Sequence, residues 1–371
     1  MRDLTASLAR LILVRLRRDE RGVIAALVAV LIGSGVLLGM GALVIDVGQL
    51  YQERAELQNG ADAAALGVAK SCALGACTND VANQLADGNA SSLTGGTEGV
   101  TLICGSGSLG SCPAGPGSLT SCPSQPPAGT NFADVYTATR TASGSTLLPP
   151  VFATTLMGSA YQGTTVRACA QAEWGAPSTA TAVGLAISAC EWDQDTQRGT
   201  LFAPAPPYSQ NPLPSASFDQ QLMLNPGNGA GCATEPAGAD GSGNFGWAQA
   251  APGTCTLAIT GPTFPESTAA VTAACQTTLQ NAQQNQTAIL VPVYVSLNSA
   301  VNTYALKGFA DFVVTGYDFG PGLSEPDWLD PANTCTGTND CVTGYFVQGV
   351  IPSTGSFAGP SLGAYLIDLT G

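Results

Sequence analysis

The most informative pattern in this chain is one long apolar segment near the N-terminus. Residues Val23 to Ile45 carry no charged side chain over 23 positions, and they directly follow an arginine-rich stretch at 15–21. A helix of this length spans about 34 Å, enough to cross a hydrocarbon core of roughly 30 Å. Because only a helix satisfies its backbone polar groups inside lipid, the segment predicts a single transmembrane helix. A buried helix of a soluble protein is the alternative.

Charge on either side of this segment predicts its orientation. Six arginines and three acidic residues precede it, whereas six basic and 23 acidic residues follow it. Since positively charged flanks stay cytoplasmic, we expect residues 1–21 on the inner side of the plasma membrane and the C-terminal region in an extracytoplasmic position. A cleaved secretory signal is the rival interpretation. The apolar run is longer than a typical signal peptide requires, which favours an uncleaved signal anchor.

The helical pattern continues beyond the apolar segment as a stem. Residues 46–70 are rich in Ala, Gln, Glu and Leu, which are good helix formers. Their apolar positions fall three, four or seven residues apart, on one stripe: Val47, Leu50, Leu57, Ala61, Ala64 and Val68. A stripe this narrow suits packing against another helix or against the protein's own globular part, and the pattern leaves both alternatives open.

Beyond the stem, alternating and turn-rich segments predict a β-rich region. Gly, Ser, Thr and Pro dominate residues 91–130, which predicts disulfide-pinned loops. Helical patterns occur at Val151–Tyr161 and Ser267–Asn285. The expected strands are Asp134–Arg140, Thr164–Trp174, Thr256–Thr260, Ile289–Val295, Thr303–Tyr317, Val342–Ile351 and Ala364–Leu369. The expected fold class is therefore α+β: a long N-terminal transmembrane and stem α-helix, followed by a β-rich, disulfide-containing extracytoplasmic region.

A proline-dense segment at Ala203–Pro214 predicts a linker between an inner and an outer part. The expected organisation has five parts: a basic cytoplasmic N-terminus at 1–21, the transmembrane helix and stem at 22–70, an inner extracytoplasmic part at 71–202, the linker at 203–214 and an outer β-rich domain at 215–371.

The cysteines predict disulfide bonds in an oxidising compartment. All 12 follow the apolar segment, and the chain contains no histidine. Their spacing lacks the close CxxC pairs of zinc sites, so metal binding is disfavoured. The best local candidates for disulfide pairs are Cys72 with Cys77 and Cys335 with Cys341.

Composition also excludes several classes of function. The formal net charge of −14 argues against nucleic acid as a partner. The absence of histidine removes the usual base for nucleophilic catalysis, and the glycines form no Walker or dinucleotide fingerprint. We therefore expect no enzyme, no cofactor, no metal and no small-molecule substrate.

Two local patterns indicate chemistry more weakly. Glu191 and Asp193 are the best candidate pair of carboxylates for glycoside hydrolysis, although their polar, loop-like surroundings favour a solvated turn. Asp327, Asp330 and Asp340 are candidate calcium ligands, but they lack the spacing of a known calcium loop. A surface glycan-binding or hydrolytic head on a generic membrane anchor is therefore the alternative function.

One composite motif covers about residues 20–70. It consists of an Arg-Gly turn into the apolar helix, an Asp-x-Gly-x-x-Tyr step and a polar helix reading LQNGADAAAL. The segment resembles the N-terminal domain of Flp (Tad) pilus-assembly proteins of the TadE/TadG-like kind. The matching family-motif positions include Gly22, Asp46, Gly48, Tyr51, Gln58, Asn59 and Asp62.

This resemblance implies a membrane-anchored, pseudopilin-like protein of the bacterial cell envelope with a structural or assembly role. Its implied partners are the lipid bilayer and other pilin-like or Tad secretion components.

Gly35 and Gly39 form a GxxxG pattern that permits close helix packing in a membrane. Pilin-like members with a processed leader carry glutamate five positions after the cleavage-site glycine. That position is Leu27 here, which speaks against cleavage after Gly22. Larger relatives can carry a metal site that opens with Asp-x-Ser-x-Ser, but the nearest string, at 240–244, is expected to be a loop.

Overall fold

The structure is a computed structural model of the 371-residue chain. It describes residues 2–77, 80–89, 99–112, 130–152, 154, 162–224, 244–267, 271–333, 335, 340–351 and 355–370. Within these ranges, the side chains of residues 2–21, 34–38, 80, 81 and 87 are not described. The chain divides into two compact units. The first contains 1–61, 86–101 and 136–169, and the second contains 62–85, 102–135 and 170–371.

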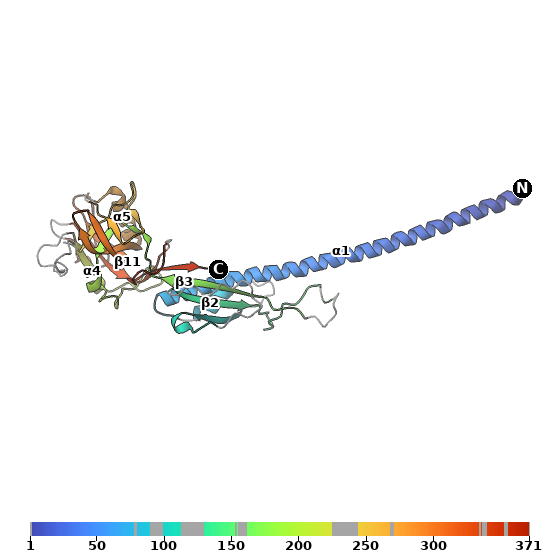
Figure 1. The fold of residues 1–371 in the computed structure, drawn as a ribbon, viewed down its shortest axis with the longest axis horizontal. Coiled ribbons are helices and arrows are strands. Elements are labelled where there is room, and N and C mark those ends of the chain that lie inside the picture. Colours follow the sequence, from blue (N-terminus) through green and yellow to red (C-terminus); the bar gives the residue numbers. More distant parts are fainter. Residues whose placement is uncertain are drawn as a thin grey trace. The chain divides into compact units, whose positions relative to one another are not determined.

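The N-terminal helix α1 is continuous over 72 residues, from Arg2 to Ala73 (Figure 1). It contains no proline, and its glycines do not interrupt it. The described large apolar side chains between Val23 and Val47 are mostly exposed, and Val30 and Val44 are each 69% exposed. Within the residues whose side chains are described, which leave out 34–38 in the middle of the apolar segment, no helix is long and apolar enough to cross a membrane.

The other helices are short. They are α2 (Asp80–Asn89), α4 (Ala189–Asp195), α5 (Ala273–Asn285) and the 3-10 turns η1 (Gly107–Leu109) and η2 (Ala216–Phe218). Two helices of the second unit, α4 and α5, have N-caps that satisfy free backbone amides: Ser188 Oγ accepts from the amide of Glu191, and Thr272 Oγ1 accepts from the amide of Cys275.

A five-stranded sheet has the order β1-β2-β3-β15-β14. Its strands are β1 (Gly99–Gly105), β2 (Asn131–Ala138), β3 (Arg167–Gly175), β14 (Gly349–Val350) and β15 (Ala364–Leu369). In the second unit, β15 pairs antiparallel with β3, and Leu366 lies opposite Gly175.

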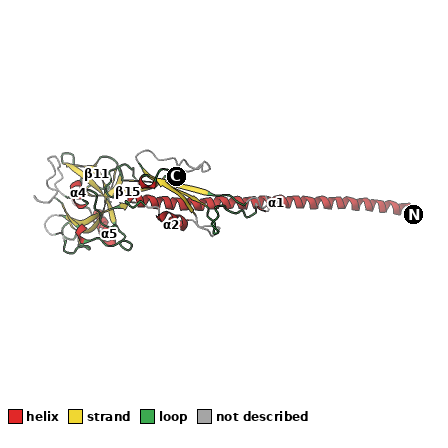
Figure 2. Ribbon diagram, turned by 90° about the horizontal axis from the view of Figure 1, so that it is seen from below, coloured by secondary structure: helices red, strands yellow, loops and turns green. Residues whose placement is uncertain are grey.

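A larger, mixed sheet lies wholly in the second unit (Figure 2). Its order is β6-β13-β11-β10-β5-β7, and β9 and β12 also pair with β11. Its strands are β5 (Leu185–Ser188), β6 (Gln220–Met223), β7 (Phe245–Trp247), β9 (Thr263–Pro265), β10 (Ala288–Asn298), β11 (Thr303–Asp318), β12 (Ser324–Glu325) and β13 (Cys341–Val347). A separate two-stranded antiparallel sheet consists of β4 (Ala180–Val183) and β8 (Thr256–Ile259).

The central strand β11 is buried on both faces because its residues alternate between two clusters. Ala310, Phe312 and Val314 pack into the cluster that also contains α5. Val313 points to the opposite face, where it packs with Tyr345. This alternation places the few polar residues of β11 at defined positions on each face.

The expected strands are largely observed, with shifted ends. Ala364–Leu369 forms β15 with the expected bounds, whereas the expected strand Val342–Ile351 is divided into β13 and β14. The expected helix Ser267–Asn285 is shorter, because it begins after its N-cap Thr272. The expected helix Val151–Tyr161 falls almost entirely outside the described residues.

Two expectations of irregular structure are wrong. The stretch 91–130 contains the strand β1. Glu191 to Asp195 form most of the helix α4 and are not a solvated turn, because Ser188 caps the helix and Trp192 is buried within the core.

Residues 203–214 run along the second sheet, where Ala203 forms a bridge to Val347 and packs with it.

Candidate functional site

Two of the family-motif residues of α1 hold later parts of the first unit by hydrogen bonds. Asp46 Oδ1 accepts from the backbone amides of Val151, at 2.8 Å, and Phe152, at 3.0 Å. Gln58 Nε2 donates to the backbone oxygen of Cys169 at 2.9 Å. Both side chains therefore serve as anchors for backbone that follows about 100 residues later.

The expected apolar stripe of the stem is covered by the protein itself from its midpoint onward. Leu57 and Ala61 are fully buried in the first unit, and Ala64 and Val68 are fully buried in the second. In the first unit, Thr137 Oγ1 also donates to the backbone oxygen of Leu57 at 3.0 Å. Of the two alternatives for this stripe, packing against the protein's own globular part therefore holds from Leu57 onward.

Other family-motif residues of the stem face away from the chain. Tyr51 is 73% exposed, and Asn59 and Gly48 are also exposed. A Cβ added at Gly22, Gly39 or Gly48 would meet no described atom within 4 Å. Asp62 is half-buried and has an interaction partner, and Gly35 lies among the residues whose side-chain surroundings are not described.

An acidic residue is buried in the stem. Glu53 is 2% exposed, and the pKa of its carboxyl is raised, chiefly by burial. A hydrogen bond with Thr139 partly offsets this rise in pKa, and the charge of the nearby Glu56 adds to it. Glu53 Oε2 has no hydrogen-bond partner among the described residues. The sequence does not single out this position, because a glutamate in a polar helix has no pattern of its own.

The candidate carboxylate pair in α4 is not brought together. Glu191 is buried, and Asn244 Nδ2 donates to its Oε2. Asp193 points elsewhere and forms an ion pair with Lys307 at 3.0 Å. Lys307 also lies 5.0 Å from the ring centre of Trp192. Since the two carboxylates have separate partners, the geometry does not support them as an acid–nucleophile pair.

A different carboxylate of α4 is the neighbour of Glu191. Asp195 follows one helical turn later, and burial together with the Glu191 charge raises the pKa of Asp195 to about 8. Burial likewise raises the pKa of Glu191. Among the described residues, Asp195 Oδ2 is buried without a hydrogen-bond partner. Asp195 therefore favours its protonated form near neutral pH, as expected for a buried carboxyl beside another acid.

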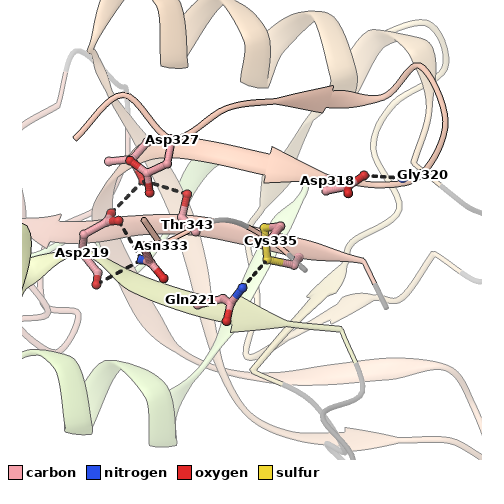
Figure 3. The surroundings of a disulfide bond; sticks show 10 residues. Asp219, Gln221, Asp318, Gly320, Asp327, Asn333, Cys335 and Thr343 are labelled. Atoms are coloured by element: carbon pink, nitrogen blue, oxygen red, sulfur yellow. Dashed lines mark hydrogen bonds between the residues drawn. A yellow bond between two sulfur atoms is a disulfide. The ribbon is translucent and has the colours of Figure 1, made fainter. Parts of the chain in front are cut away.

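The second sheet contains a further pair of facing carboxylates, Asp219 and Asp327 (Figure 3). The hydroxyl of Thr315 on β11 lies 2.7 Å from Asp219 Oδ1 and 3.2 Å from Asp327 Oδ2. Asn333 Nδ2 donates to Asp219 Oδ2 at 2.8 Å. Burial is the largest cause that raises the pKa of Asp219 well above its ordinary value, and the adjoining Asp327 carboxyl raises it further. Asp219 is therefore largely protonated at neutral pH.

The partners of this pair determine its role. Asp327 Oδ1 accepts from the backbone amides of Leu329, at 2.8 Å, and Asp330, at 2.9 Å. All four carboxyl oxygens thus have protein partners, and both residues are buried. The pair therefore ties the start of β6 and the loop after β12 to β11, and its oxygens are not free for a substrate.

The calcium hypothesis is not supported by this arrangement. Asp327 is turned inward to Asp219, whereas Asp318 lies at the far end of the same region (Figure 3). Burial, and to a lesser extent the Asp318 charge, raises the pKa of Asp340. Asp330 Oδ1 accepts from the amide of Ala332. The three acids named from sequence therefore have three different environments. The string at 240–243 lies outside the described residues.

Every cysteine in the described ranges is disulfide-bonded. Cys72 is bonded to Cys77 and Cys335 to Cys341, the two short-range pairs named above. Cys104–Cys112 and Cys255–Cys275 are further pairs, which close loops over 8 and 20 positions. Cys104 and Cys112 approach Asp134 closely, but a disulfide leaves no thiolate to bind a metal.

Comparison with known proteins identifies the stem. Residues 22–71 match the family model described as "Putative Flp pilus-assembly TadE/G-like". No curated protein matches the chain, and no solved structure matches it. The matched segment contains Asp46 and Gln58 and ends before the two sheets begin. The resemblance of the stem is thereby confirmed: residues 22–71 of this chain are similar to the Flp pilus-assembly TadE/G-like family.

Proposed function

We propose that this protein is a structural component of a Flp-type pilus-assembly apparatus in the bacterial cell envelope. The observation that carries the proposal is the TadE/G-like match over residues 22–71. The matched segment lies within the helix α1, whose side chains are exposed in one part and buried in another. Side chains such as Val30 and Val44 are exposed, whereas Leu57, Ala61, Ala64 and Val68 of the stripe are buried by the protein itself. Among the described residues, the large apolar side chains before residue 48 are thus available to partners, and the stripe from Leu57 onward is not.

The finer part of the proposal is a pseudopilin-like membrane anchor. In it, residues 23–45 lie within the bilayer, residues 1–21 are cytoplasmic, and the β-rich parts are extracytoplasmic. The charge-free apolar segment and its arginine-rich flank support this orientation. The disulfides among the described cysteines fit an oxidising compartment. The boundaries of an inner part at 71–202, a linker at 203–214 and an outer domain at 215–371 belong to the same proposal.

Within the bilayer, we assign the glycine-rich side of the helix to contacts with other pilin-like or Tad secretion components. Small residues let helix backbones approach closely where lipid offers no hydrophobic driving force. A side chain introduced at Gly39 would meet nothing within 4 Å in the described part of this chain. A substitution there therefore tests partner contacts without disturbing the folded protein.

The experiment compares Gly39→Leu with Gly41→Leu in cells that express the pilus-assembly components. The two positions lie about 200° apart around the helix, and both are open in this chain. We expect Gly39→Leu to reduce co-purification of those components at least fivefold, and Gly41→Leu to leave it within twofold. Undiminished co-purification of the Gly39→Leu protein would contradict a packing role for this side of the helix. Native protein that co-purifies with no pilus-assembly component would contradict the proposed function as a whole.

A further inference from the structure

Asp311 is a buried acid in an unusual position, at the centre of the larger sheet. It lies on β11 opposite Leu290 of β10 and Val347 of β13. By alternation it shares a face with Val313, and it is 3% exposed. A carboxylate in such a place loses most of its hydration, and burial alone raises the pKa of Asp311 to about 7.

This carboxyl group has no side-chain hydrogen bond within the described part of the chain. Several other buried acids of the second unit do have such a bond: Asp134 accepts from Gln171, Glu191 from Asn244 and Asp219 from Thr315. Buried polar groups in folded proteins are nearly always hydrogen-bonded, so each exception calls for an explanation. An external donor is one such explanation.

Asp311 lines a cleft of about 1010 Å³, large enough for a small ligand or a short peptide segment. The other walls come from 205–211, from 285–288 after α5 and from 347–350. The backbone at Gly349 packs directly against the carboxyl, because a Cβ built there would clash with Asp311 Oδ2. The absence of a side chain at Gly349 therefore keeps room for the carboxyl group.

The lining determines which ligand fits. Asp311 is the single carboxylate among the described lining residues, whereas calcium requires six to eight oxygen ligands. Pro206, Pro207 and the half-buried ring of Tyr208 offer apolar surface beside it. A ligand with hydrogen-bond donors, a positive charge and an alkyl stem would satisfy both the carboxylate and this wall.

We propose that this cleft binds an organic cation carried on an alkyl chain, of the lysine side-chain or diamine type, with Asp311 as its anionic partner. Other titratable groups that line the cleft are Lys70 and Tyr208. Lys70 is exposed and forms no ion pair among the described residues, so it leaves Asp311 free. Burial raises the pKa of Tyr208, which therefore stays neutral near pH 7.

The test follows the backbone amide resonance of Gly349 in the full-length protein during titration with two probes, Nα-acetyl-lysine-N′-methylamide and 1,4-diaminobutane. We expect saturable shifts with at least one probe, and tighter binding of the capped lysine would identify a peptide as the source. Affinity should rise about tenfold from pH 6 to pH 8, as Asp311 ionises.

Variants make the assignment specific. Asp311→Asn, which keeps the shape of the protonated acid, should weaken binding at least tenfold, and Asp318→Asn on the same strand should leave it within twofold. Lys70→Ala should also leave it within twofold. Absence of saturable shifts at either pH, or equal affinity in the Asp311→Asn protein, would overturn the proposal. A tenfold gain in the Lys70→Ala protein would overturn it as well, because the chain's own lysine would then fill the site.

Discussion

The side-chain amide of Gln58 donates a hydrogen bond of 2.9 Å to the backbone carbonyl of Cys169, 111 positions later in the chain. Gln58 belongs to the TadE/G-like segment, whereas Cys169 lies on β3, outside it. The contact therefore assigns a physical role to one residue of the motif: it attaches the stem to backbone that the family match does not cover.

Replacement of Gln58 by alanine should loosen this attachment. A partly buried hydrogen bond contributes about 1 kcal/mol, and the carbonyl of Cys169 would be left without this donor. We expect hydrogen exchange of the amides at the start of β3 to accelerate about fivefold. Asn59→Ala, at the exposed neighbouring position, is the matched control. Equal exchange rates in the two variants would contradict the role of Gln58.

The Asp219–Asp327 pair makes stability depend on pH. In the unfolded chain an aspartate has a pKa of about 3.9, and in the folded protein burial and the Asp327 carboxyl raise that of Asp219. Because the folded state then binds more protons than the unfolded state, the free energy of unfolding falls as pH rises above about 4, until the folded pKa is passed. Replacing Asp327 with asparagine removes the neighbouring charge and lowers the pKa of Asp219.

The prediction is that the loss of stability between pH 5 and pH 8 is smaller in the Asp327→Asn protein than in the native protein. One pKa unit corresponds to 1.36 kcal/mol, so we expect a difference of about 1 kcal/mol in denaturant unfolding. Asp330→Asn, which removes a nearby charge that forms no hydrogen bond with Asp219, serves as the control. An unchanged pH dependence in Asp327→Asn would show that the two carboxyls are not coupled.

The ion pair between Lys307 and Asp193 should contribute little to stability. Its side chains are 28% and 40% exposed, and pairs of this kind contribute between zero and about 1 kcal/mol. We expect Lys307→Met to lower the free energy of unfolding by less than about 1 kcal/mol at low salt, and high salt to reduce the difference. A loss of several kcal/mol that persists in high salt would instead show that packing of Lys307 on Trp192 matters.

The sequence predicts the elements whose residues carry a strong local pattern. Ala364–Leu369 and Thr303–Tyr317 alternate and are rich in β-branched and aromatic residues, so both are close to the observed strands β15 and β11. The helical pattern of the stem likewise agrees with α1. Short elements such as β1 and α4 were missed, because tertiary contacts and one capping serine stabilise them more than their own propensity does.

Contacts between distant residues were not predictable in the same way. The stripe containing Leu57 and Ala61 indicated a buried face, but the pattern did not decide between another helix and the protein's own sheet. Asp219 and Asp327 are far apart in the chain, and they meet because both accept hydrogen bonds from Thr315 of β11. The spacing of the two aspartates along the chain does not predict this contact. Asp311 is one acid within a strand of apolar neighbours, and its isolation is visible only in the fold.

Hydrogen exchange along α1, measured on the full-length protein reconstituted in lipid vesicles, tests the central claim most directly. The account predicts three zones: strong protection at 23–45 within the bilayer, faster exchange at 46–56 and renewed protection at 57–69, where the apolar stripe is buried. Exchange at 23–45 as fast as that at 46–56 would contradict the membrane-anchored, assembly-helix account.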